Sequence, residues 1–523
     1  MKGILGKYAL AFFISLVGYI IYASLILSPS IYKSYSLIDD GQTYINSEYF
    51  KDCITLKGCS NFFNKVVLEK EFNRFRPTYW IIQSAGELIT NHNPQLLHGI
   101  RVFGVGTLIV LLQLIILIKL DIHPTLLPLS VALTTINLSF TENIVRLGPI
   151  EPYQVILLGL YSLVLLSKLK QKQKILLFVL GVLLVSLKET SLVLIISSFV
   201  ILFLFGNRKE KRYSLLLAIS LLALYGLGKH LASNNNNTYT ESYVLKPEII
   251  IRNAKLYFSM LMNYFGSFAT LSLLMIPLLF LKGIRKMIFN KPNAFWLITS
   301  VLLIGILLPW EYVLDRYILP VVFCTSILIS IILNILIVKS IDAANKFIRF
   351  KYSPVVFYSL VTIVVLNLYF RTFPINIAKS INYQRWYAQF LLFEKDQLEA
   401  IAGLKEGTVV KVNAKDELGN WEVFYELPIH MGYIYKKRII FERLSETNYK
   451  KGDIIFSRSI LTPFVEESTI NKKTSIIATK SYSVPQIDPI IFRNMFVNDT
   501  VGAIVNPPIG DTYTFFWTVG KVK

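Results

Sequence analysis

Apolar stretches of about the length that crosses a lipid bilayer recur along this chain of 523 residues. A transmembrane helix needs about 20 mostly apolar residues, because its backbone polar groups find no water in the bilayer core. Charged residues make up only 17% of the chain, against roughly 25% in soluble proteins. The sequence therefore predicts a polytopic α-helical membrane protein with about 11 transmembrane helices. The predicted spans are 8–28, 102–120, 124–140, 152–167, 174–187, 191–206, 213–229, 256–281, 294–309, 318–338 and 354–370.

The distribution of basic residues orients these spans. If the N-terminus is cytoplasmic, the short connections on its side contain 19 Lys and Arg residues and three acidic residues. Cytoplasmic loops carry such an excess, and anionic inner-leaflet lipids attract it. The formal net charge of +21 is therefore interpreted as a topology signal, with membrane lipids and no nucleic acid as the partners. The first span is too long for a signal-peptide core and is expected to remain as an anchor.

The first long segment on the opposite side is the loop 29–101. It contains the pair Asp39-Asp40, and its stretch 73–80 is rich in Arg and aromatic residues. The spacing there predicts a helix in the membrane interface, with Tyr79 and Trp80 at headgroup level. Cys53 and Cys59 share this loop. Outside the cytosol they can form a disulfide or remain free, and the sequence leaves both open.

Two further long outer segments are predicted, at about 230–255 and in the tail. Residues 371–523 contain no spanning run and predict a small extracytoplasmic α/β domain, behind a transmembrane domain of residues 1–370. An amphipathic pattern predicts a helix over 383–403. Strands are predicted at 408–412, 438–441, 453–456 and 514–517.

Three short outer connections also carry ionisable residues at the membrane boundary. Such residues cost several kcal/mol at bilayer depth unless they are paired or face a wet cavity. Taken singly, each could be an anchor that snorkels to water. Together with Asp39-Asp40, they favour one polar cavity at the outer leaflet. The residues concerned are Glu142, Arg146, Glu151, Lys188, Glu189, Glu311, Asp315, Arg316 and Tyr317.

Two kinds of chemistry are predicted for this cavity. A carboxylate of Asp39 or Asp40 could act as general base toward an acceptor hydroxyl, although Asp-Asp-Gly could equally be a turn that ends a helix. Cations could hold a lipid phosphate, because Arg grips it with two N–H donors and Lys as a point charge. The predicted phosphate-binding residues are Arg74, Arg76, Arg146, Lys188 and Arg316. The predicted substrate-binding residues are Glu142, Glu151, Glu189, Glu311, Asp315 and Tyr317. The five histidines show no metal-ligand spacing and are predicted to be incidental.

The membrane part of the chain resembles the GT-C superfamily of membrane glycosyltransferases. The resemblance rests on Asp39-Asp40 after the first span, the long first outer loop, and the motifs at 146–152, 188–190 and 315–320. It implies inverting transfer of a sugar from a polyprenyl-phosphate donor to a glycan, lipid or polymer acceptor in the cell envelope, as in polysaccharide biosynthesis. A first-loop aspartate would be the base. Many members pair Asp with Glu where this chain has Asp-Asp, which leaves the roles within the pair open.

Some members of this superfamily use a divalent metal ion. Asp40 with Glu142 or Glu151 could supply oxygen ligands to Mg²⁺ or Mn²⁺, but no metal site is assigned. Two other functions stay open. A transporter or flippase of lipid-linked sugars would be expected to place charges at the bilayer midplane and to show repeated halves. A polysaccharide polymerase or ligase would be expected to carry a late loop rich in Arg and His.

Overall fold

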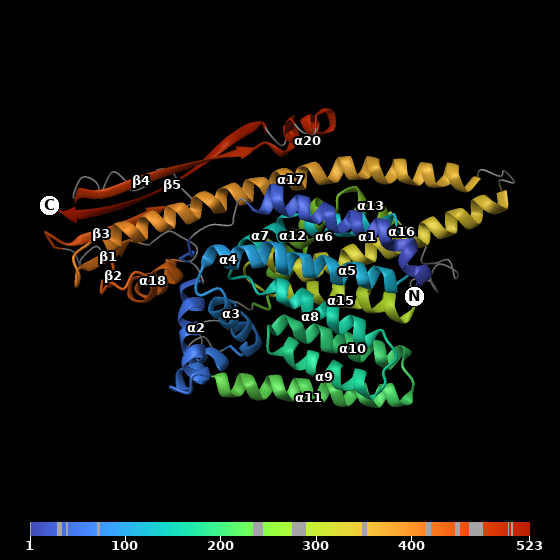
Figure 1. The fold of residues 1–523 in the computed structure, drawn as a ribbon, viewed down its shortest axis with the longest axis horizontal. Coiled ribbons are helices and arrows are strands. Elements are labelled where there is room, and N and C mark those ends of the chain that lie inside the picture. Colours follow the sequence, from blue (N-terminus) through green and yellow to red (C-terminus); the bar gives the residue numbers. More distant parts are fainter. Residues whose placement is uncertain are drawn as a thin grey trace.

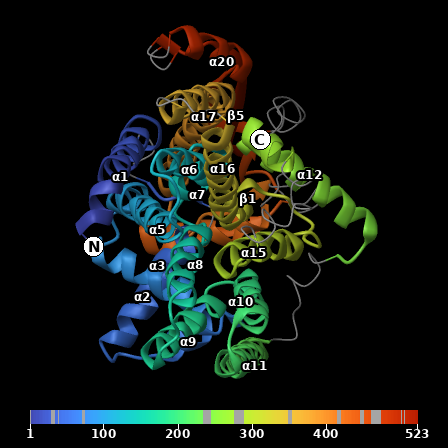
Figure 2. The same ribbon diagram turned by 90° about the vertical axis from the view of Figure 1, so that its right-hand side faces the viewer.

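Long apolar helices lie side by side and form the body of the molecule in the computed structural model (Figures 1 and 2). The structure describes residues 2–28, 34–37, 40–70, 74–233, 244–274, 289–347, 353–413, 420–444, 450–459, 474–499, 502–503 and 506–523. Asp39 lies outside these residues.

The helices of the body follow the predicted apolar runs in order. The first are α1 (Lys2–Tyr22), the helical turn η1 (Ala23–Leu27), α4 (Pro94–Gly99), η5 (Ile100–Val105), α5 (Gly106–Lys119), α6 (Leu126–Thr135), α7 (Leu138–Val145) and α8 (Glu151–Leu165). Then come α9 (Gln171–Val185), η6 (Glu189–Ser191), α10 (Leu192–Phe205), α11 (Arg208–Ala232), α12 (Pro247–Phe265), α13 (Ser267–Leu274), α15 (Lys291–Leu307), η9 (Asp315–Ile318), α16 (Leu319–Phe347) and α17 (Ser353–Ala402). The predicted helical membrane architecture is confirmed.

The number of membrane spans stays a prediction. Within the described residues, four helical stretches are long and apolar enough to cross a bilayer: Gly6–Leu27, Pro94–Lys119, Arg208–Ala232 and Asp315–Ile337. Some predicted runs are interrupted. The run 124–140 divides into α6 and α7 because the Asn137 side chain accepts a hydrogen bond from the Phe140 N–H and starts a new helix.

The first outer loop folds into α2 (Asp40–Ile54), η3 (Phe62–Val67) and α3 (Pro77–Ile89). A disulfide joins Cys53 to Cys59. The side chains of Tyr79 and Trp80 are buried in protein and do not face outward from the molecule, whereas their depth relative to the lipid head groups stays a prediction. The Tyr79 hydroxyl donates to the Gly148 carbonyl over 2.6 Å, so α3 packs on the α7–α8 connection.

The C-terminal part is a small α/β unit, as predicted. Its elements are β1 (Val409–Asn413), α18 (Asn420–Ile429), η10 (His430–Ile434), β2 (Ile440–Arg443), β3 (Ile454–Ser459), β4 (Thr474–Ile487), α20 (Pro489–Asn498) and β5 (Ile509–Val522). The sheet order is β2-β1-β3-β5-β4, with β1 parallel to β2 and β3, and β5 antiparallel to β3 and β4. The four predicted strands overlap β1, β2, β3 and β5, whereas β4 was not predicted.

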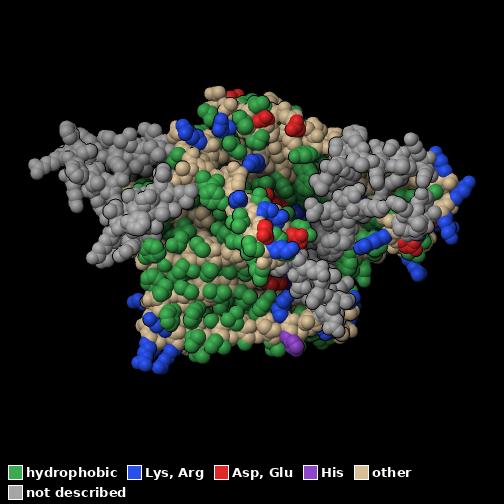
Figure 3. All heavy atoms as spheres, turned by 180° about the vertical axis from the view of Figure 1, so that it is seen from behind, with side chains coloured by type: hydrophobic (Ala, Val, Ile, Leu, Met, Phe, Trp, Pro, Cys, Tyr) green, Lys and Arg blue, Asp and Glu red, His purple; other side chains and the backbone are tan. Residues whose placement is uncertain are grey.

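Helix α17 connects the body to this sheet. It runs unbroken from Ser353 to Ala402, through the predicted domain boundary at residues 370–371. Figure 1 shows α17 extending along the bundle and then under β4 and β5, with the N- and C-termini at opposite ends of the molecule. In the view from behind, hydrophobic side chains cover much of the bundle, whereas acidic and basic side chains gather in the middle of this face (Figure 3).

Candidate active site

Asp40 is the first residue of α2, and its side chain is buried at 2% exposure. Its Oδ2 accepts a hydrogen bond from the Ser36 N–H over 2.8 Å. A carboxylate at a helix N-terminus is favoured by the helix dipole. The next residue, Gly41, lies against α18, because a Cβ there would fall 2.1 Å from Glu426 Oε2 and force that side chain to move. The C-terminal unit therefore packs directly on the turn that carries Asp40.

Glu394 of α17 holds the residues just before Asp40. Its Oε2 accepts from the Ser36 hydroxyl and from the Leu37 N–H, each over 2.9 Å. Its other oxygen lies 3.4 Å from Nη1 of Arg458 on β3, and both side chains are fully buried. Burial raises the pKa of Glu394, while Arg458 opposes that rise. One buried ion pair thus ties the first loop, α17 and the sheet together.

Two tyrosines of α17 connect Asp40 to the basic residues of later loops. Burial raises the pKa of Tyr387; the Asp40 charge acts in the same direction, and the Arg146 charge acts against it. Asp40 and Arg146 therefore both lie within electrostatic range of one phenol. One turn earlier, Tyr383 hydrogen-bonds Arg146 and lies within range of Glu142 and Arg316. Arg146 follows α7 and also pairs with Glu142 over 3.4 Å.

Lys188, Glu151, Arg316 and Tyr317 form the next part of this group. Glu151 is the first residue of α8, is 1% exposed, and forms an ion pair with Lys188 from the α9–η6 connection. The charge of Arg316 also acts on Glu151. The ring of Tyr317 lies near both cations, 4.7 Å from Lys188 Nζ and 5.4 Å from Arg316 Cζ.

Arg74 and Arg76 lie in a second group, built around Glu69 and Glu189. Arg76 pairs with the buried Glu69 over 2.5 Å. The charges of Arg76 and Arg74 both act on Glu189. Lys188 and Glu189 are adjacent in sequence yet face different partners, so the two groups adjoin along the backbone.

Two predicted substrate-binding residues occupy other surroundings. The Asp315 carboxylate accepts from the Tyr264 hydroxyl and lies within electrostatic range of Glu142. The Glu311 side chain is exposed, and its backbone carbonyl accepts from Arg252 over 2.9 Å. Asp315 therefore borders the charged group, whereas Glu311 makes its contact with α12.

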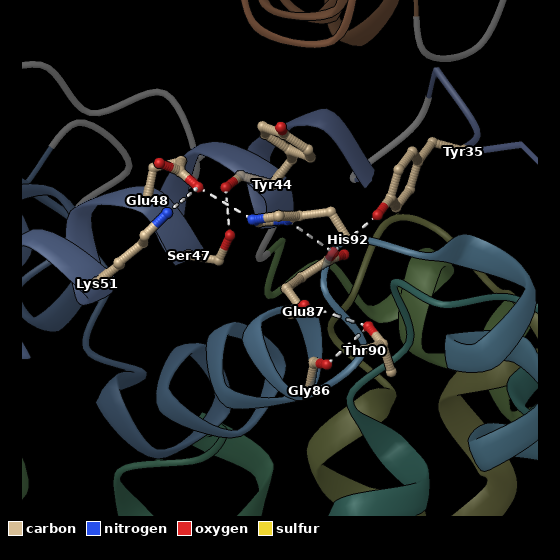
Figure 4. A network of polar contacts seen from close by, with 9 residues as sticks. All are labelled: Tyr35, Tyr44, Ser47, Glu48, Lys51, Gly86, Glu87, Thr90 and His92. Carbon is tan, nitrogen blue, oxygen red and sulfur yellow. Dashed lines mark hydrogen bonds and ion pairs between the residues drawn. The ribbon is translucent and has the colours of Figure 1, made fainter.

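A further polar network lies in the first loop beside Tyr35 (Figure 4). The Tyr35 hydroxyl donates to Glu87 Oε2 over 2.8 Å. The two ring nitrogens of His92 approach Glu87 at 3.4 Å and Glu48 at 3.0 Å. Tyr44 stacks on the His92 ring, with centroids 4.3 Å apart. The network joins α2 to α3 and reaches the residue that precedes Ser36.

No pattern in the sequence singled out the residues of α17, α18, η10 and β3 around the Asp40 turn. These residues are Tyr383, Tyr387, Glu394, Glu426, His430 and Arg458. One signal was present: Glu394 directly follows the apolar stretch Phe390–Phe393, where an isolated acid suggests a buried partner. No spacing in the sequence connects it to Arg458, 64 residues later.

The site was also tested for a divalent metal. Within the described parts of the chain, no group of three or more His, Cys, Asp or Glu residues is arranged to hold a metal ion. Asp40 shares no such group with Glu142 or Glu151, so these residues do not fit the metal site that the resemblance allowed.

Among known proteins, solved structures similar to this chain were found. No protein-family model matches the chain, and no curated protein matches it. Two similar solved structures are those of ArnT from Cupriavidus metallidurans, bound to undecaprenyl phosphate and in the apo state. The first has 12% identity and a TM-score of 0.45 over 88% of this chain and 96% of that chain. The second has 12% identity and a TM-score of 0.43 over 88% and 95%.

Proposed function

We propose that this protein is a membrane glycosyltransferase that moves a sugar from a polyprenyl-phosphate donor to a hydroxyl acceptor, with inversion at the anomeric carbon. One arrangement supports the proposal: Asp40 is buried at the start of α2, and the cation Arg146 from a distant loop lies, like Asp40, within electrostatic range of Tyr387. A candidate base for the acceptor and a candidate counter-charge for the leaving phosphate therefore lie around the same part of α17.

The proposed reaction is a single displacement. The acceptor oxygen attacks the anomeric carbon and the bond from that carbon to the phosphate oxygen breaks, which inverts the configuration. The acceptor proton passes to the aspartate, and the polyprenyl phosphate leaves with the bonding electron pair. A base within hydrogen-bond reach contributes about 10²–10⁴ in rate. Fixed cations that stabilise developing phosphate charge contribute further.

Asp40 is the first choice for the base. Its side chain is buried, and its Oδ2 accepts a hydrogen bond from the Ser36 N–H, which fixes the orientation of the carboxylate. Asp39 remains the alternative base. The surrounding residues Glu394 and Glu426 hold the backbone of this turn rather than any substrate.

The donor phosphate is assigned to Arg146, Lys188 and Arg316. They come from three outer connections and converge around Tyr383 and Tyr317. Glu142 and Glu151 partly neutralise them, which lets phosphate compete for the same donors. Arg74 and Arg76 extend the basic surface from the neighbouring group. Glu189 and Asp315 would border the sugar, and Glu311 would act only at the rim.

The proposed location is the cell membrane, with a cytoplasmic N-terminus and the C-terminal unit outside. The opposite positions of the two termini support this arrangement (Figure 1), as does the basic excess on the N-terminal side.

The base is tested with Asp39→Asn, Asp40→Asn and the double variant, in a transfer assay with a polyprenyl-phosphate sugar. Asp40→Asn is expected to lower the turnover rate about a hundredfold or more, with an unchanged unfolding midpoint. Asp52→Asn is the matched control, because Asp52 is an exposed acid on the same helix. Normal transfer by all three variants would remove the aspartate base from the proposal.

A further inference from the structure

A cavity of about 620 Å³ lies on the side of α17 that faces away from the proposed active site. Its walls come from η1, α17 and the strands β4 and β5. Figures 1 and 2 show α17 running between the helical bundle and these strands. The wall formed by β4 is fixed, because Asn382 of α17 exchanges two hydrogen bonds with the Ile487 backbone, at 2.9 and 2.7 Å.

Helical spacing separates this cavity from the charged group. The α17 residues that line it are Ile381, Gln384, Arg385, Ala388 and Gln389, which share one face at intervals of three and four residues. Tyr383, Tyr387 and Glu394 lie on the opposite face of the same helix. A ligand in this cavity would therefore be separated from Asp40 by the width of α17.

The charged group of the cavity is Arg385. Its side chain is half-buried, and burial lowers its pKa. No hydrogen bond or ion pair joins Arg385 to another described residue. A guanidinium that is partly removed from water without a counter-ion costs free energy unless an anion pairs with it. Gln389 and Ser483 stand nearby on the wall as uncharged hydrogen-bonding groups.

The opposite wall is apolar and adjoins exposed hydrophobic residues of the stretch Gly6–Leu27, which is long and apolar enough to cross a bilayer. Leu25 and Ile26 of η1 line the cavity. Leu25 is 58% exposed, and Ile21, one turn earlier, is 53% exposed. Both belong to the first predicted span, at its outer end. One end of the cavity therefore offers apolar contacts that the predicted first span would place at membrane depth, and the other end offers a cation.

We propose that this cavity binds a membrane lipid with an anionic phosphate head group, with the phosphate at Arg385 and the hydrocarbon chain along Leu25 and Ile26. The site is separate from the proposed donor site. It would hold the C-terminal sheet on the outer leaflet. The same chemistry could come from a bulk phospholipid or from a polyprenyl phosphate, and the experiment separates these two sources.

The test measures lipid retention by the full-length protein with native mass spectrometry. Detergent-solubilised protein is titrated with phosphatidylglycerol, phosphatidylcholine or polyprenyl phosphate. Arg385→Gln is expected to weaken retention of the anionic lipid about tenfold, the value of one charge-assisted hydrogen bond. Ala388→Trp, which fills the cavity, is expected to abolish it. Arg385→Lys keeps the positive charge and is expected to bind the anionic lipid almost as well as the wild type.

Arg371→Gln is the matched control, because Arg371 is an exposed arginine of the same helix, and it is expected to bind like the wild type. Retention of phosphatidylglycerol identifies a bulk-lipid site, and retention of polyprenyl phosphate alone identifies a carrier-lipid site. Equal retention by wild type and Arg385→Gln would overturn the proposal, as would equal affinity for phosphatidylcholine. Asp40→Asn is expected to retain lipid normally. The lipid-binding result therefore does not depend on whether the transferase proposal holds.

Discussion

At the scale of single residues, His92 shows how the first loop depends on ionisation. The Glu87 carboxylate, 3.4 Å from Nδ1, raises the pKa of His92, burial opposes the rise, and Glu48 supports it. The network therefore favours the charged imidazolium, which bridges two carboxylates (Figure 4). Because the folded-state pKa lies above the unfolded value of 6.5, this stabilisation is complete below pH 6.5 and is lost as the pH rises through the folded-state pKa.

The corresponding prediction concerns His92→Gln. Below pH 6.5 this variant is expected to be less stable than the wild type by about 1–3 kcal/mol, the value of hydrogen bonds to charged groups. The difference should shrink at alkaline pH. Thermal unfolding midpoints across this range give the measurement, with the exposed His230→Gln as control. A difference that stays constant with pH would mean that the charge of His92 does not matter.

At the scale of elements, the Glu394–Arg458 pair fastens β3 to α17 and to the Asp40 turn. Removing one partner from a buried pair leaves the other charge uncompensated, which costs about 3–5 kcal/mol. Arg458→Met is therefore expected to lower the free energy of unfolding of the C-terminal unit by that amount and to reduce transfer.

The double variant Glu394→Gln/Arg458→Met is expected to recover part of the stability, because it leaves no unpaired buried charge. The matched control is Lys395→Met, which breaks the partly exposed pair of Lys395 with Glu399 on the same helix and should cost less than about 1 kcal/mol. If Arg458→Met lowers the free energy of unfolding by no more than Lys395→Met does, the buried pair does not hold these elements together.

At the scale of the whole molecule, the prediction is the sidedness of the two ends. Cysteines introduced at exposed positions report it: Ser475→Cys on β4 and Lys209→Cys on α11. In intact cells a membrane-impermeant thiol reagent is expected to label only the first, and both after permeabilisation. The native cysteines add little background, because Cys53 and Cys59 form a disulfide and Cys324 is buried. Labelling of Lys209→Cys in intact cells would contradict the predicted topology.

Much of the fold could be predicted because its cause is local. Apolar runs give helices in a bilayer whatever their neighbours are, and four short β-branched runs gave four strands. β4 escaped prediction because its sequence includes Lys, Ser and Pro residues, and half of it faces solvent. The continuation of α17 across residue 370 escaped because a change from apolar to polar composition does not by itself end a helix.

Neighbouring residues along the chain are enough to predict the helical membrane class, the set of short connections rich in basic residues and the connections that mix acidic and basic residues. Only the tertiary structure decided which charges meet. Lys188 faces Glu151 while Glu189 faces Arg76, and Glu394 meets Arg458 beneath the Asp40 turn. Those partners are set by how helices and strands pack over long sequence distances, and the pattern of residues along one segment carries no information about them.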